Sequence, residues 1–158
     1  MSDLYQASAD LKATTQDLAR VESPSAALTL TRSATLAITT AGTTITWQTE
    51  TRGQGFTWSG TDITIPTSGY YVLSVTYIAN TAHTSIMRLL VGGINVLNMA
   101  ASSGSASRHG FEFMRYFTTG DVVSLSVLPS ANVTIAVNAE GVASESPILH
   151  IVQLSGVP

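Results

Sequence analysis

The stretch FTWSGTDITIPTSGYYVLSVTYI, residues 56–78, decides the fold class. From Tyr70 onward, apolar residues at odd positions alternate with more polar residues at even positions, and this period of two is typical of a strand with one buried face. Pro66 lacks a backbone donor and Gly69 tolerates a positive φ, so the PTSG segment marks the end of one strand and the start of the next. The apolar positions of the second strand are Tyr71, Leu73, Val75 and Tyr77.

The composition indicates one all-β domain with an unusually apolar surface. Charged residues make up only 11% of the 158 residues, against a usual share of about 25%. The mean hydropathy is +0.26, yet no apolar run approaches the roughly 20 residues that span a bilayer. We therefore expect no membrane segment, and we expect part of the surface to lie against another subunit. The absence of cysteine excludes a disulfide scaffold and a cysteine-ligated metal site.

The charge balance argues against a nucleic-acid partner. Seven basic and ten acidic residues give a net charge of −3, and Lys12 is the only lysine. The first residues, MSDLYQASADLK, carry acids where a signal peptide carries basic residues followed by an apolar run. We expect synthesis in a cytoplasm without export through a signal peptide.

A helical pattern precedes the β pattern. Leu4, Leu11 and Leu18 lie seven apart, and Val21 belongs to a second column three residues after them, so these residues form the seam of a short helix. Residues 1–24 are therefore predicted to form a helical arm or short coiled-coil stalk, and residues 25–158 a head domain. Pro24 ends the helix. The alternative is a lone amphipathic helix packed on its own domain.

The remainder of the chain alternates with period two between turn signals. Residues 28–39 are predicted to form one long strand or two short ones. Further strands are predicted over residues 43–49, 86–91, 94–99, 111–117, 122–128, 133–137 and 148–154, with loops at 52–55 and 100–110. Gly92 and Gly93 predict a two-residue hairpin. Many short strands without intervening helices predict an antiparallel sandwich or jelly roll.

Two segments resemble the C1q/TNF-like jelly-roll superfamily. The first is residues 56–77, with ITIP at 63–66 and Gly69-Tyr70-Tyr71, and the second is TGDVVSL at 119–125. The resemblance covers residues 28–156 and implies a ten-stranded jelly roll that assembles as a tight trimer, with a stalk entering at the N-terminus. No collagen repeat precedes the head, and no calcium-binding cluster is carried over. The short arm and cysteine-free head are more similar to small bacteriophage virion proteins than to secreted members.

Strands with bulky residues on both faces predict a subunit interface. A single sandwich core covers one face of each strand, so the other face of 86–91 and of 111–117 needs a partner. The sequence does not assign which face that is. The predicted trimer-interface residues are Leu90, Phe111, Phe113, Met114 and Tyr116.

Catalytic signatures are missing from the sequence. His83, His109 and His150 are scattered, and none has a histidine or acid at metal-ligand spacing. His109 is interpreted as a solvated or interface side chain, and His150 as a hydrogen-bonded core or interface imidazole. No Gly-x-Ser-x-Gly elbow is present. We predict that the chain is not an enzyme and has no catalytic residue, cofactor or metal.

Three hypotheses for function follow. The first is a homotrimeric capsid decoration or head-fibre protein on the exterior of a virion, whose arm residues Leu4, Leu11, Leu18 and Val21 grip the lattice of the major capsid protein. The second is the receptor-binding or glycan-binding tip of a phage tail fibre. The third is a bacterial C1q-like protein without a viral role. Residues that could hold a cell-surface glycan are Trp58, Arg108 and His109.

Overall fold

A computed structural model describes residues 26–102, 108–135 and 147–154. Every regular element in these residues is a strand, and all strand pairs are antiparallel. None of them is a helix that could cross a membrane. The strands are β1 (Ala27–Thr31), β2 (Leu36–Ile38), β3 (Thr43–Thr44), β4 (Thr49–Gln54), β5 (Thr57–Ser59), β6 (Asp62–Thr64), β7 (Gly69–Ile78), β8 (Thr84–Val91), β9 (Ile94–Ser102), β10 (Arg108–Phe117), β11 (Val122–Pro129), β12 (Val133–Ile135) and β13 (Ile148–Gln153).

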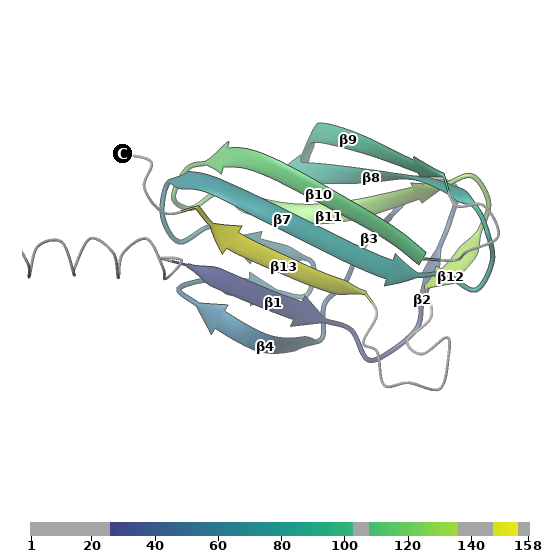
Figure 1. Ribbon diagram of the computed structural model, residues 1–158, viewed down its shortest axis with the longest axis horizontal. Helices are drawn as coiled ribbons and strands as arrows, with labels where there is room; N and C mark the ends of the chain where they lie inside the picture. Colours follow the sequence, from purple (N-terminus) through teal and green to yellow (C-terminus); the bar gives the residue numbers. More distant parts are fainter. Residues whose placement is uncertain (1–25, 103–107, 136–146, 155–158) are drawn as a thin grey trace, which may run out of the picture.

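Two sheets pack face to face (Figure 1). The first, which we call the β7 sheet, has the order β10-β7-β13-β1-β4. The second, the β11 sheet, has the order β5-β6-β11-β8-β9, with β3 also paired to β11. The short pair β12-β2 lies at one end. Neighbours that are far apart in sequence, such as β13 between β1 and β7, are the non-local pairings that a jelly roll requires.

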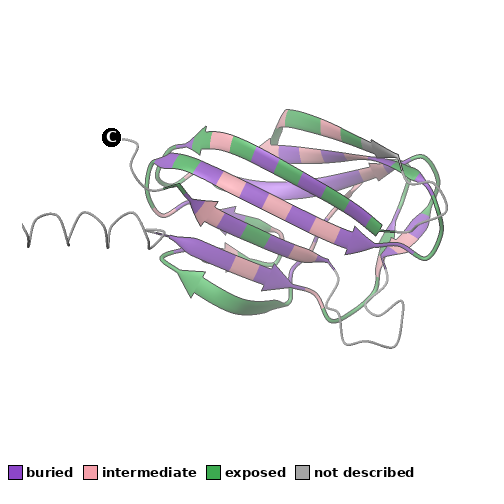
Figure 2. Ribbon diagram, viewed as in Figure 1, coloured by how far each residue is buried: buried purple, intermediate pink, exposed green. Residues whose placement is uncertain are grey.

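The core lies between the two sheets, as the alternation in β7 predicts. Tyr71, Leu73, Val75 and Tyr77 are fully buried, whereas the residues between them are exposed or partly exposed. Figure 2 shows the same alternation along β10 and β13. Burying one such side chain contributes about 1.5–3 kcal/mol. The opposing sheet contributes Met87 and Leu89 from β8 and Val123, Leu125 and Val127 from β11.

The hairpin prediction is confirmed. Gly92 and Gly93, with φ of 57° and 78°, join β8 to β9. Both values lie in the left-handed region, as a type I′ turn demands, and glycine adopts it without steric cost.

Two local predictions are wrong. Residues 52–55 were predicted as a loop, but β4 extends to Gln54 and pairs with β1. Every residue of β4 is exposed, so the segment has no apolar alternation to reveal a strand. The predicted strand 43–49 is regular only at Thr43–Thr44 and again at Thr49, where β4 begins, although Ile45 and Trp47 are buried between them.

The predicted loop at 100–110 is shorter than expected, because β9 continues to Ser102 and β10 begins at Arg108. Residues 103–107 lie outside the described residues. The predicted arm at 1–24, with Leu4, Leu11, Leu18 and Val21, also lies outside them.

Candidate functional site

The outward face of the β7 sheet carries an exposed apolar patch. Met114 and Tyr116 on β10 are 66% and 49% exposed, and Tyr70 on β7 is 39% exposed. The rings of Tyr70 and Tyr116 are in contact, and large exposed apolar side chains gathered on one face of a sheet form a candidate interaction surface. We call the following residues the outer patch: Tyr70, Val72, Met114, Tyr116 and Val152.

Strand register aligns the outer patch in rows across the sheet. Tyr116 lies opposite Tyr70, and their rings meet edge to face with centroids 5.3 Å apart. Met114 lies opposite Val72, which in turn lies opposite Val152 on β13. The outer patch therefore extends over β10, β7 and β13. These strands are adjacent in the sheet although they are far apart in the sequence.

A polar row borders the outer patch. Glu112 on β10 lies opposite Ser74 on β7, Ser74 opposite His150 on β13, and His150 opposite Thr29 on β1. The His150 ring is exposed, and its Nδ1 lies 3.0 Å from Thr29 Oγ1. His150 is thus not in the core, and the core alternative of its interpretation is wrong. An apolar centre next to a polar margin is the usual layout of a protein interface.

The interface prediction is corrected for two of its five residues. Phe111 and Phe113 are 4% and 1% exposed and pack inside the sandwich, so their own chain already covers them. Leu90 is partly buried and belongs to β8 in the other sheet. It therefore does not share a face with Met114 and Tyr116, which both lie on the outer face of the β7 sheet.

The residues predicted to bind a glycan do not converge. Trp58 on β5 is half-buried against the core, and its Nε1–H donates to Glu50 Oε2 at 2.6 Å. Arg108 is exposed at the start of β10, which lies beside β9. Strands β5 and β9 are opposite edges of the β11 sheet, so Trp58 and Arg108 lie on opposite sides of the sandwich. His109 is 2% exposed, so its interpretation as a solvated side chain is wrong.

The structure brings together two histidines that the sequence separates. The rings of His83 and His109 have centroids 4.3 Å apart, and the His109 ring stacks on Tyr77 at 4.8 Å. Ser85 Oγ lies 3.2 Å from His109 Nδ1 and accepts a hydrogen bond from Tyr77 Oη at 2.9 Å. Tyr77 Oη also lies 3.1 Å from His83 Nε2. We call these four residues the histidine cluster.

Burial perturbs the titration of this cluster. It lowers the pKa of His109 to about 4, with a further lowering from the charge of His83. Burial also raises the pKa of Tyr77 to about 12, against the smaller opposite effect of its hydrogen bond with Ser85. Sequence spacing contains no signal for the cluster, since the pairing of His109 with Tyr77 depends on the register of β10 on β7.

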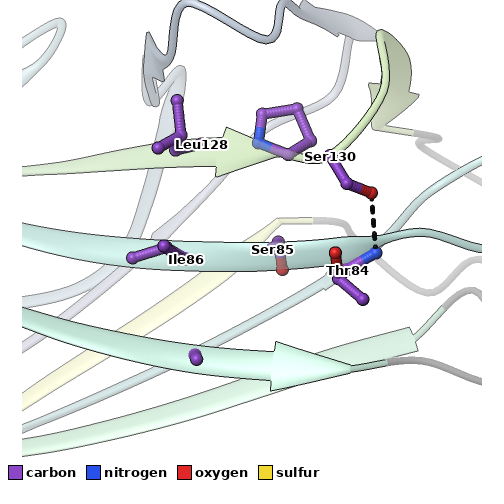
Figure 3. Close-up of a pocket in the computed structure, with 7 residues that line it drawn as sticks. Thr84, Ser85, Ile86, Leu128 and Ser130 are labelled. Atoms are coloured by element: carbon purple, nitrogen blue, oxygen red, sulfur yellow. Dashed lines mark hydrogen bonds between the residues drawn. The ribbon is translucent and has the colours of Figure 1, made fainter.

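An open cavity of about 460 Å³ lies beside β8 and β11 (Figure 3). Thr84 N–H donates to Ser130 Oγ at 3.2 Å at its polar end. Its lining lacks a titratable side chain, and in the described part of the chain no three histidine or acidic residues gather as metal ligands would. The cavity is lined by Thr84, Ser85, Ile86, Ala100, Leu128, Pro129 and Ser130.

No family model matches the chain, and no curated protein matches its sequence. Solved structures, in contrast, match its fold. Murine APRIL superposes with a TM-score of 0.59 at 17% identity, covering 82% of this chain and 98% of APRIL. The PRD1 vertex protein P5 follows with 0.56 at 20% identity, covering 83% of this chain and 73% of P5. The chain has the C1q/TNF-like jelly-roll fold.

The globular domain of zebrafish complement 1qA protein shares this C1q/TNF-like fold, with a TM-score of 0.52 at 10% identity over 82% of this chain and 95% of that domain. The resemblance that residues 56–77 and 119–125 carry is thereby confirmed for the fold. A phage vertex protein, P5, is among the similar structures.

Proposed function

We propose that the chain is a structural virion protein that assembles as a homotrimer through the outer patch and decorates the exterior of a phage capsid. The observation that carries the proposal is the exposed apolar outer patch on a fold shared with a phage vertex protein. An apolar patch that stays in water costs free energy, and association with further copies of the same chain would cover it.

The composition of the outer face supports association. Its centre consists of two tyrosines, a methionine and two valines, and tyrosine and methionine are enriched in interface cores. The row of Glu112, Ser74 and His150 supplies a polar margin. Light scattering coupled to size exclusion tests the trimer directly: we expect a mass of three chains for the full-length protein, and a monomer at micromolar concentration would contradict it.

The capsid role is proposed for the arm at residues 1–24. Deleting these residues is expected to leave a folded trimer, because the outer patch belongs to the head, and to abolish incorporation into particles. Mass spectrometry of purified virions measures the occupancy, with the full-length chain as the control. Full occupancy of the deleted chain would show that the arm does not attach it to the major capsid protein.

The alternative of a glycan-binding tip has less support. Trp58, Arg108 and His109 do not share a surface, and the Trp58 ring packs against the core with its Nε1–H already bound to Glu50. We propose no enzymatic activity and no cofactor, because the cavity of the described residues presents only hydroxyl, backbone and apolar groups.

A further inference from the structure

The histidine cluster spans the two layers of the sandwich at one end. Tyr77 and His109 belong to β7 and β10 of the β7 sheet, whereas Ser85 belongs to β8 of the β11 sheet. His83 lies in the connection between β7 and β8, and its Nδ1 lies 3.0 Å from the Thr81 carbonyl oxygen. The hydrogen bonds of the cluster therefore tie one sheet to the other at a point where all four side chains are buried.

His109 has one ring nitrogen with a hydrogen-bond partner and one without. Its Nδ1 lies 3.2 Å from Ser85 Oγ, which accepts a hydrogen bond from Tyr77 O–H. Its Nε2 is buried without a hydrogen-bond partner among the described residues. A buried polar atom without a partner costs free energy, and the cost is larger when the ring is charged.

A second proton on His109 has no favourable place. A protonated ring donates from both nitrogens, and its Nε2–H would have no acceptor among the described residues. The positive charge would lie beside His83, whose ring centroid is 4.3 Å away. Burying an imidazolium without a counter-ion is strongly unfavourable.

Among the described residues, no acidic group packs against His109 to compensate that charge. In the described residues, the titratable groups packed against His109 are Tyr77 on β7 and His83 before β8; β8 itself contributes the Ser85 hydroxyl. Strand β9, beside β10, has no charged residue. Arg108 and Glu112 lie on β10 at exposed positions of the opposite face.

We propose that the histidine cluster is an acid-sensitive clamp between the two sheets, which loosens this end of the sandwich when His109 binds a proton. The unfolded or opened chain gives His109 an ordinary, solvated environment, so acid favours the open form. The opening would separate β8 from β7 and β10 beside the cavity formed by Thr84, Ser85 and Ser130. This inference concerns the single chain and does not depend on the trimer.

The test compares unfolding at pH 7 and pH 5, a range in which few carboxylates titrate. A pKa near 4 in the folded state against 6.5 in the unfolded state predicts an unfolding constant about 20-fold larger at pH 5 than at pH 7. His109→Phe keeps an aromatic ring on Tyr77 but does not titrate, so it should remove most of this increase. His150→Gln is the matched control, since His150 is exposed on the same sheet. It should keep the wild-type increase.

Denaturant titrations of the full chain at fixed protein concentration measure these constants. An equal pH effect in wild type and His109→Phe overturns the proposal. Histidine side-chain NMR on the wild type gives an independent answer that does not require the variant to fold. We expect one of the three imidazoles, assigned to His109, to titrate well below 6.5. A His109 midpoint at its ordinary value also overturns the proposal.

Discussion

Replacing Met114 with aspartate is expected to convert the assembled protein into monomers without unfolding the head. Met114 is the most exposed of the large apolar side chains on the outer face and lies on the edge strand β10, opposite Val72 of the outer patch. In an assembly that covers the patch, each copy would bury an unpaired carboxylate, which costs several kcal/mol per chain. We expect the association constant to fall by at least about 100-fold, since 3 kcal/mol corresponds to that factor.

Light scattering across a dilution series measures this change. Tyr116→Asp should act in the same way, because its ring pairs with Tyr70 on the same face. The matched control is Asn98→Asp, which adds the same charge at an exposed position of β9 in the other sheet. A variant Met114→Asp that remains a trimer would move the interface away from the outer patch.

Replacing Phe113 with alanine is expected to destabilise the fold by about 3–5 kcal/mol, the usual cost of emptying a buried phenylalanine site. The side chain is 1% exposed and packs between the sheets. Because domains of this size are stable by only about 5–15 kcal/mol, the loss would be a large part of the total. Denaturant unfolding of the variant and of the wild type at equal concentration measures it.

Glu112→Ala is the control for that experiment, since Glu112 is the exposed neighbour of Phe113 on the same strand. It should change the stability of the fold by less than about 0.5 kcal/mol. If Phe113→Ala instead dissociated the assembly and left the unfolding free energy of the chain unchanged, Phe113 would belong to the interface after all.

The substitutions at Met114 and Phe113 both change β10, a strand whose two faces the sequence does not distinguish. FEFMRYF has bulky residues at both parities, so its period does not distinguish the core face from the outer face. In the structure, β10 pairs with β7 along its whole length, and this register turns Phe111, Phe113 and Phe117 toward the opposing sheet. Met114 and Tyr116 are left outside. Which face of β10 is buried therefore depends on its pairing with β7 and not on the sequence of β10 itself.

The sequence by itself determined the strand class, the central strand β7 and its buried face, and the glycine hairpin. These features depend on local alternation and on turn residues, which act over a few positions of the chain. The jelly-roll fold was indicated by the resemblance of residues 56–77 and 119–125 to the C1q/TNF-like superfamily. Only the tertiary structure decided that β4 is a strand, because an edge strand with every residue exposed shows no periodicity. The tertiary structure also places Leu90 and Met114 in different sheets and brings the rings of His83 and His109 into contact. Local sequence does not predict either feature, because sheet order and strand register are set by contacts between distant segments.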